Sequence, residues 1–163
     1  MTVEEIIATL GLVPHPEGGY YAETWRAPGR TTDLPARYDG PRSHGTAIHY
    51  LLTADSFSAM HRVASDEIFH FYLGDPVEQL WLVPDGSHRV VRIGSDLRSG
   101  ARPQVVVPYG TWQGARLVPG GRFALLGCTV APGFDFADFR MGERAALVAD
   151  WPAAAALITA LTR

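Results

Sequence analysis

From Thr46 to about residue 140 the chain alternates between short apolar stretches and clusters of Pro, Gly and Asp that favour turns. Many short strands at roughly ten-residue spacing predict a sandwich or a barrel, whereas alternating strands and helices would be required for a parallel sheet. The segments expected to be strands are Thr46–Thr53, Phe57–Val63, Glu67–Leu73, Glu78–Val83, Arg89–Ile93, Gln104–Val107, Trp112–Leu117, Arg122–Val130 and, with the least regular pattern, Phe134–Phe139.

Helices are expected at both ends of this all-β region. Thr2–Leu10 begins with the spacing of a capping box, in which Thr2 and Glu5 satisfy each other's backbone N–H groups. At the other end, Asp150 is expected to cap an alanine-rich helix over Trp151–Leu161. The chain is therefore expected to be mainly β, with a short helix at each terminus.

Between the first helix and the barrel, the chain is expected to form one more strand and one long connection. Tyr20–Arg26 has the composition of a strand. Ala27–Gly45 is rich in Pro, Gly, Arg and Asp, which predicts a long excursion or a mobile loop. No internal repeat or linker interrupts the chain, so residues 1–163 are expected to form one domain.

Composition excludes several kinds of chemistry. All 14 positively charged side chains are Arg and none is Lys, so neither a Schiff-base Lys nor a P-loop Lys can exist. The net charge of −3, without a basic cluster, argues against a nucleic-acid partner. Cys128 is the only cysteine, which excludes an intramolecular disulfide and thiolate zinc clusters.

The chain is expected to work in the reducing cytoplasm and not in a membrane. Its start, MTVEEIIATLGL, lacks the positive charge of a signal peptide. No apolar run approaches the ~20 residues that a membrane-spanning helix requires.

The segment HRVASDEIFHFYLG, from His61 to Gly74, contains the best candidates for chemistry. Strand alternation places Glu67, Phe69 and Phe71 on one face. A carboxylate beside two phenyl rings is expected to bind a cation, to hold a His, or to stay protonated as a general acid. An ion pair with an Arg at the barrel mouth is the simpler structural alternative.

Two spaced motifs give this segment a family resemblance. His61, Glu67 and Gly74 match the first cupin motif from its first His onward, and Pro108-Tyr109-Gly110 followed by Gln113 matches the second. The chain thus resembles the cupin superfamily, which implies a double-stranded β-helix, or jelly roll. Longer blocks resemble its uncharacterised fifth family; they are Leu12–Thr24, Ser65–Pro76 and Gly127–Phe139.

Compared with the family pattern, the chain has lost two expected imidazoles. Val63 and Gln113 stand where ligating His residues are usual, and Val63 cannot bind a metal. Transition metals in cupins favour imidazole, so no tightly held cofactor is expected. A weakly bound divalent metal, held by His61, Glu67 and Gln113, stays an open alternative.

Metal-free cupins that resemble this chain include sugar-nucleotide epimerases, in which a His acts as base and a Tyr returns the proton. The resemblance implies acid–base isomerisation, epimerisation or elimination on a small polar molecule, such as a sugar- or nucleotide-like one. His61 is then the base, Glu67 orients it or shares its proton, and Tyr50 or Tyr109 is the acid. A binding module without catalysis and a metal-dependent oxygenase or isomerase are the alternatives.

Further residues are expected to surround the ligand or another copy of the chain. Aromatic residues in small barrels are often only core, but some are expected to line the pocket together with Gln113; the ligand-binding candidates are Phe69, Phe71, Tyr109, Trp112, Gln113 and Phe134. His15 is expected at the pocket edge or against a neighbouring subunit. Because open sheet edges favour pairing, a homodimer formed through Tyr20–Arg26 is expected.

Overall fold

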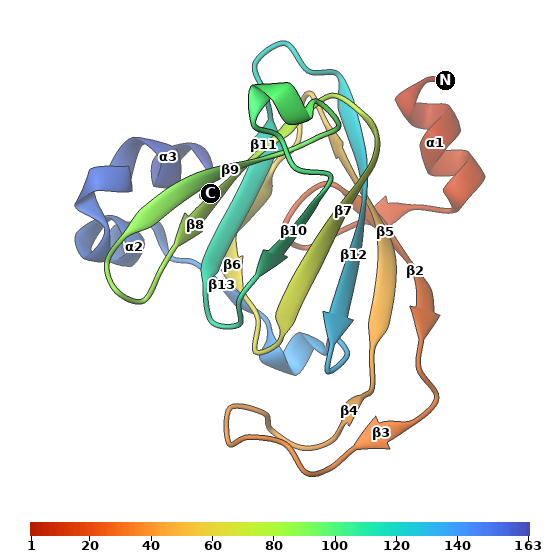
Figure 1. Cartoon of the computed structure of the whole chain (residues 1–163), viewed down its shortest axis with the longest axis vertical. Helices are drawn as coiled ribbons and strands as arrows, with labels where there is room; N and C mark the ends of the chain where they lie inside the picture. Colours follow the sequence, from red (N-terminus) through yellow and green to blue (C-terminus); the bar gives the residue numbers. More distant parts are fainter.

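Two antiparallel sheets face each other and enclose the interior of a barrel (Figure 1). The structure, a computed structural model, describes residues 1–163. The six-stranded sheet has the order β1 (Val13–Pro14), β2 (Tyr20–Arg26), β5 (Thr46–Thr53), β12 (Phe123–Ala131), β7 (Asp66–Gly74), β10 (Gln104–Val107). The five-stranded sheet has the order β13 (Arg140–Met141), β6 (Ser58–Arg62), β11 (Trp112–Leu117), β8 (Val77–Leu82), β9 (His88–Ile93).

The strands predicted from Thr46 to Val130 are all present, and their ends differ from the prediction by one residue at most. The strand predicted over Phe134–Phe139 is wrong. Residues Phe136–Asp138 form a 3-10 turn, η2, because the Asp135 carboxylate accepts the Ala137 N–H at 2.9 Å and closes the backbone locally.

The N-terminal helix, α1 (Val3–Leu10), is confirmed, including the capping box between Thr2 and Glu5. The C-terminal helix is corrected. Three short segments replace it: α2 (Arg144–Asp150), η3 (Pro152–Ala154) and α3 (Ala155–Ala160). Asp150 ends α2 where it was expected to cap a helix, since Pro152 offers no N–H and keeps Trp151 out of the helical conformation (φ −127°, ψ 63°).

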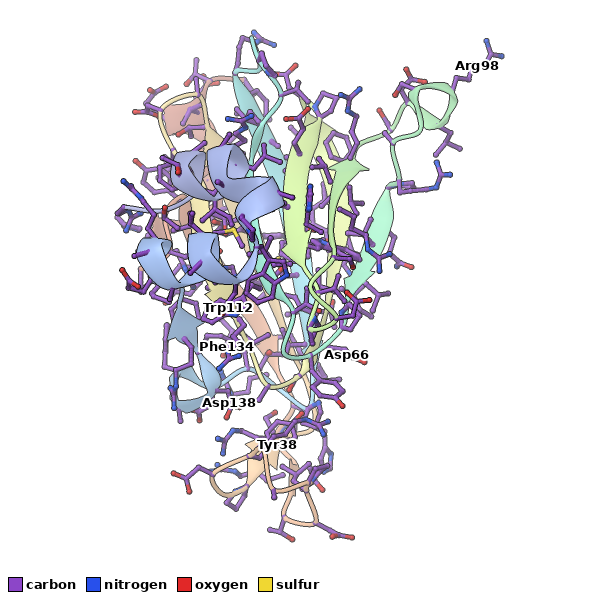
Figure 2. The ribbon with its side chains drawn as sticks, turned by 90° about the vertical axis from the view of Figure 1, so that its left-hand side faces the viewer. Tyr38, Asp66, Arg98, Trp112, Phe134 and Asp138 are labelled. Carbon is purple, nitrogen blue, oxygen red and sulfur yellow. The ribbon has the colours of Figure 1, made fainter.

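The apolar core has three parts. The largest lies between the sheets and contains 13 buried residues from both of them. A second lies under α2 and α3, which cover the outer face of the five-stranded sheet (Figure 2). The third lies under α1, where Ile6 and Leu12 pack on Leu51 and Leu125 of the six-stranded sheet.

The excursion over Ala27–Gly45 forms a small hairpin, β3 (Arg30–Thr31) and β4 (Arg42–Ser43), that extends from one end of the barrel (Figures 1 and 2). Arg42 at its base donates two hydrogen bonds of 2.7 Å to the Asp138 carboxylate, and both side chains are buried. This bidentate ion pair joins the hairpin to η2, beside the mouth of the cavity described next.

Candidate functional site

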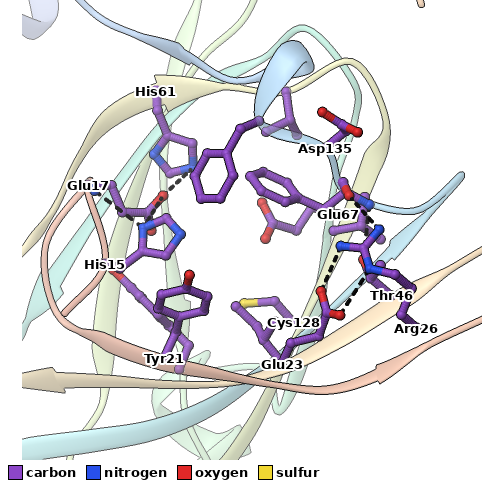
Figure 3. A pocket seen from close by; sticks show the side chains of 16 residues that line it. His15, Glu17, Tyr21, Glu23, Arg26, Thr46, His61, Glu67, Cys128 and Asp135 are labelled. Atoms are coloured by element: carbon purple, nitrogen blue, oxygen red, sulfur yellow. Dashed lines mark hydrogen bonds and ion pairs between the residues drawn. The ribbon is translucent and has the colours of Figure 1, made fainter. Parts of the chain in front are cut away.

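A cavity of about 250 Å³ opens at the end of the barrel where β5 and β7 begin (Figure 3). Its walls come from β2, β5, β6, β7 and β12, from the loop between β1 and β2, and from the segment that follows β12. The lining residues are His15, Glu17, Tyr21, Glu23, Arg26, Thr46, Ile48, Tyr50, His61, Val63, Glu67, Cys128, Val130, Phe134, Asp135 and Phe136.

Glu17 lies at the centre of the cavity's polar contacts, although it belongs to a loop. Gly18 and Gly19 follow it with φ angles of 114° and 69°, which side chains with a Cβ rarely adopt. At Gly18 a Cβ would also collide with the backbone carbonyl of Phe57. The two glycines therefore let the loop lie against β5 and the start of β6, so that Glu17 enters the barrel.

The buried Glu17 carboxylate binds Ser58 and His61 and lies close to His15. Ser58 Oγ donates to Oε1 at 2.8 Å. Oε2 lies 3.2 Å from His61 Nε2 and 3.6 Å from His15 Nδ1. The carboxylate partner of His61 is therefore Glu17, whereas the sequence suggested Glu67 for this position.

The protonation pattern of His61 follows from its two neighbours. Nδ1 lies 2.8 Å from the Ala59 carbonyl oxygen, which can only accept, so Nδ1 carries a hydrogen. Nε2 faces the Glu17 carboxylate. The ring also stacks on Phe139, with centroids 5.3 Å apart, which fixes its orientation.

Glu67 ends a hydrogen-bonded chain that crosses the barrel. Trp81 Nε1 donates to Gln79 Oε1 at 2.9 Å, Gln79 Nε2 donates to Gln113 Oε1 at 2.8 Å, and Gln113 Nε2 donates to Glu67 Oε2 at 2.6 Å. An indole N–H can only donate, so it sets the direction of every bond in the chain. Gln113 therefore presents its amide nitrogen to Glu67, and Glu67 Oε2 is an acceptor.

The surroundings of Glu67 favour its neutral form. Burial raises the pKa of its carboxyl from 4.5 to about 7, and the negative charge of Glu17 acts in the same direction. The opposing influences are the charge of His61 and the hydrogen bonds from Gln113 and the Cys128 thiol. A carboxyl with a pKa near neutrality can both donate and accept a proton under physiological conditions.

Two other groups in the cavity stay uncharged. Burial lowers the pKa of His15, and its Nδ1 accepts the Glu17 backbone N–H at 3.3 Å, which leaves the proton on Nε2. Burial raises the pKa of the Tyr50 hydroxyl well above its ordinary value, and this hydroxyl donates to the Gly18 carbonyl at 2.8 Å.

The mouth of the cavity is formed by β2 and by the segment after β12. Arg26 binds both carboxylate oxygens of Glu23, at 3.0 and 2.7 Å, and donates to the Phe134 carbonyl at 3.2 Å. Phe134 and Phe136 meet edge to face, with centroids 5.0 Å apart. The mouth is thus narrowed by aromatic rings and by one internally paired guanidinium group (Figure 3).

Four of the residues predicted for the site line this cavity: His61, Glu67, Tyr50 and Phe134. Strand alternation led to the correct face for Tyr50, which lies there beside Thr46 and Ile48. Gln113 does not line the cavity; it supports Glu67 from behind.

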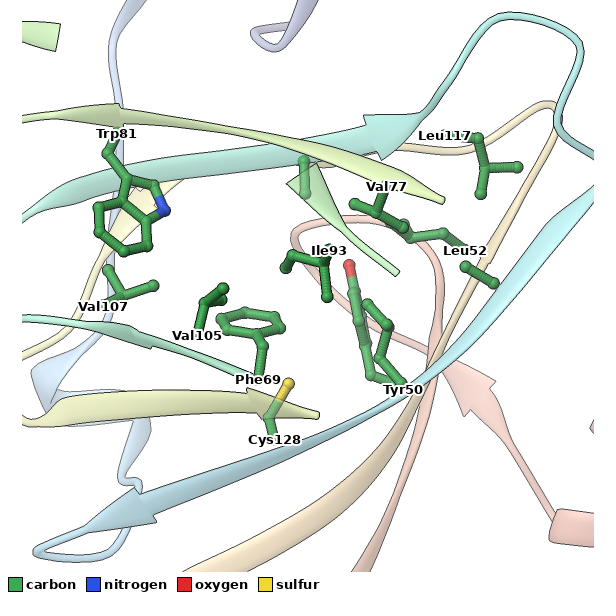
Figure 4. Close-up of a cluster of buried hydrophobic side chains, with 13 residues drawn as sticks. Tyr50, Leu52, Phe69, Val77, Trp81, Ile93, Val105, Val107, Leu117 and Cys128 are labelled. Atoms are coloured by element: carbon green, nitrogen blue, oxygen red, sulfur yellow. The ribbon is translucent and has the colours of Figure 1, made fainter. Parts of the chain in front are cut away.

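The expectation that four other aromatic residues line the same pocket is corrected. Phe69 and Phe71 share the inward face of β7 with Glu67, but Phe69 belongs to the apolar core farther along the barrel (Figure 4), and the partly buried Phe71 packs against that core. Trp112 faces the opposite side of its strand and packs beneath the C-terminal helices. Tyr109 is 52% exposed and is covered on one side by the Arg37 guanidinium, 4.1 Å from its centroid.

Sequence reasoning missed Glu17 and the charged pair Arg26–Glu23. Glu17 lies in a turn, where no periodicity reveals the direction of a side chain. The only sequence signal was its position directly before two glycines, inside the block that resembles the fifth cupin family.

The expected metal alternative does not fit these residues. Gln113 Oε1 is occupied by Gln79, so it offers no carbonyl ligand beside Glu67. Nowhere in the chain do three or more His, Cys, Asp or Glu side chains come together in a way that could hold a metal ion.

A double-stranded β-helix with a polar cavity at one end defines a cupin barrel. The family described as Cupin superfamily (DUF985), Cupin_5, matches residues 4–142. The chain belongs to this family, as its motifs suggested.

Similar proteins are known from distant organisms. A hypothetical protein from Leishmania major has 32% identity and a TM-score of 0.92, with 99% of both chains covered. Protein SO0799 from Shewanella oneidensis has 33% identity and a TM-score of 0.88, covering 100% of this chain and 98% of that one. An uncharacterized protein of Saccharomyces cerevisiae is 32% identical over 155 residues, which are 87% of this chain and 77% of the yeast protein.

None of the helices is long and apolar enough to cross a membrane.

Proposed function

We propose that the cavity binds a small polar organic molecule and that the protein catalyses proton transfer on it. The observation that carries this proposal is the presence, in one cavity, of two different proton-binding sites. One is the His61–Glu17 pair, and the other is Glu67, whose carboxyl has a pKa raised to about 7 by burial. A buried carboxyl whose pKa is raised to near neutrality, beside a second group that can hold a proton, is typical of acid–base sites.

The two sites have distinct roles in this proposal. The His61–Glu17 pair removes a proton from the substrate, and the proton is then shared between Nε2 of His61 and Oε2 of Glu17, which lie 3.2 Å apart. Glu67, in its protonated form, donates a proton from Oε1 to a second substrate atom, because Oε2 already accepts from Gln113. In an isomerisation the substrate loses one proton and gains one; in an elimination the donated proton leaves with the departing group.

Glu67 replaces Tyr50 as the acid in this assignment. The Tyr50 hydroxyl is used by the Gly18 carbonyl, and its raised pKa opposes ionisation. Tyr50 therefore forms a wall of the cavity and holds the loop that carries Glu17.

The proposal can be tested without knowing the substrate. The purified protein is incubated in D₂O with a library of polar carbon acids, such as sugars and hydroxy acids, and NMR detects loss of C–H signals. We expect exchange of at least one compound that is lost in both His61→Asn and Glu67→Gln. His88→Asn, a substitution at an exposed position outside the cavity, is the control.

Two results would contradict catalysis. Exchange in His61→Asn at the wild-type rate would remove His61 from the chemistry. A library compound that binds in the cavity but never exchanges would instead favour a binding module, the second candidate function.

We also propose a homodimer that pairs along β2. β1 pairs with only two residues of this strand, Tyr20 and Tyr21, so the remaining edge is free to bind another strand. Light scattering after size-exclusion chromatography is expected to give twice the chain mass. A monomer at micromolar concentration would reject the proposal.

A further inference from the structure

The cavity carries more negative than positive charge. Four carboxyl groups line it, from Glu17, Glu23, Glu67 and Asp135. The positive side chains are Arg26 and, when it is protonated, His61, since burial keeps His15 neutral. A ligand that enters the cavity therefore meets a net negative environment, even when Glu67 holds its proton.

The one guanidinium in the cavity is not free to bind an anion. Both carboxylate oxygens of Glu23 accept from Arg26, and the Phe134 carbonyl accepts from a third nitrogen. These contacts neutralise the charge of Arg26, and the N–H donors of its guanidinium group are used by protein groups. A phosphate or carboxylate ligand would have to displace Glu23 and leave that carboxylate unpaired.

Glu67 is a buried carboxyl without a cationic side chain in contact. It accepts from a neutral amide, Gln113, and no Arg or His lies within ion-pair distance of it. The Cys128 thiol, which is also uncharged, is its other hydrogen-bond partner, and Glu67 lines the cavity. A positively charged ligand group is therefore the missing partner that would make its ionised form favourable there.

Aromatic rings surround the path to these carboxyl groups. Tyr21 and His15 meet edge to face at 4.6 Å between centroids, and His15 stacks with Phe136 at 6.2 Å. Phe134 lies against Phe136. The faces of such rings attract organic cations and do not attract anions.

We propose that the cavity selects a small organic cation, a molecule with an ammonium group that binds between Glu67 and the rings of Tyr21, Phe134 and Phe136. This inference rests on the proposed function, because it takes the cavity to be the substrate site. It narrows the substrate class from polar molecules in general to amines, and it removes nucleotides, whose phosphates would face four carboxyl groups.

Three probes of similar size test the proposal: benzylamine, benzyl alcohol and benzoate. We expect calorimetry or ligand-observed NMR at pH 7 to show benzylamine binding at least about tenfold tighter than benzoate, with benzyl alcohol between them. Binding of benzylamine should also release protons, so its heat should depend on the ionisation enthalpy of the buffer.

The variant Glu67→Gln tests whether the preference for benzylamine comes from the carboxyl charge of Glu67 or from the shape of the cavity. It should reduce the preference for benzylamine over benzyl alcohol by about three- to tenfold, because the amide keeps the volume but loses the charge. Glu78→Gln is the matched control, since Glu78 pairs with Arg92 and Arg116 on the outer surface at 3.5 and 3.7 Å. This control should leave the preference unchanged.

Three results would overturn the inference: tighter binding of benzoate, an unchanged preference in Glu67→Gln, or no binding of any probe at about 10 mM. The proposed catalysis can fail separately. If benzylamine is preferred but no compound exchanges in D₂O, the proposed cation site is supported and the proposed catalysis is rejected. If an anionic compound exchanges, the proposed catalysis is supported and the proposed preference for cations is rejected.

Discussion

The two ends of the barrel interior differ sharply, although the same strands build both. On the inward face of β7, Glu67 lines the polar cavity, and two residues later Phe69 lies in an apolar cluster of 13 buried residues. The apolar end supplies the burial that stabilises the fold. That stability allows the other end to keep a carboxyl away from water, with a pKa suited to proton transfer.

The boundary between the two ends is a row of buried amides. Gln79 and Gln113 connect Trp81, in the apolar cluster, to Glu67, in the cavity. No buried side-chain polar atom in the structure lacks a hydrogen-bond partner, so the polar end is fully satisfied despite its burial. The comparison teaches that this polar region has a defined geometry and is not merely a defect in packing.

The largest effect on stability is expected at the apolar end. Phe69→Ala removes a buried ring and should lower the free energy of unfolding by about 3–5 kcal/mol. Urea unfolding followed by tryptophan fluorescence measures the change. Tyr109→Ala, at an exposed position, should stay within about 0.5 kcal/mol of the wild type. A loss below about 1 kcal/mol for Phe69→Ala would show that the apolar end does not dominate stability.

At the polar end, Glu67→Gln should increase stability at alkaline pH. A carboxyl with a folded-state pKa of about 7 and an ordinary value of 4.5 favours folding in its neutral form. Wild-type stability should therefore fall as the pH rises from 4.5 to about 7, by on the order of 3 kcal/mol. The variant should lack this fall, so it should match the wild type near pH 4.5 and exceed it at pH 8.

Thermal unfolding of both proteins across this pH range tests the expectation. Glu78→Gln, which removes a half-buried carboxylate outside the cavity, should keep the wild-type profile. Parallel profiles for the wild type and Glu67→Gln would show that Glu67 is charged at neutral pH.

The smallest effect is expected at the boundary. Gln113→Met removes the donor to Glu67 and leaves the Gln79 amide without its acceptor, which should cost about 1–3 kcal/mol. The pKa of Glu67 should rise further, since the hydrogen bond from Gln113 lowers it. Trp81→Phe, which removes only the far end of the chain, should cost less and leave that pKa nearly unchanged. If the pKa of Glu67 were the same in Gln113→Met and in Trp81→Phe, the expected difference between these two variants would be contradicted.

Much of the fold could be predicted from the sequence, because turn residues and strand alternation are local signals. Strand alternation predicted correctly which strand faces carry Glu67 and Tyr50. It could not show that the cavity ends before Phe69, since the depth of a pocket depends on which residues the opposite sheet contributes.

The partner of His61 could not be predicted for a different reason. Glu17 is 44 positions away and lies in a turn, where its direction depends on the left-handed conformations of Gly18 and Gly19. The direction of the Gln113 amide was equally hidden, because it is set by Trp81 through a third residue. Long-range hydrogen bonds of this kind leave no periodic pattern in a sequence.

The central claim is that the polar end of the barrel holds a carboxyl that titrates near neutrality. The most direct test is a ¹³C NMR titration of the glutamate side-chain carboxyl groups, with the Glu67 resonance assigned by its absence in Glu67→Gln. The structure predicts a midpoint at about pH 7 for this resonance. A midpoint near the ordinary value of 4.5 would contradict the account, because Glu67 would then be a permanent carboxylate and could not act as the acid.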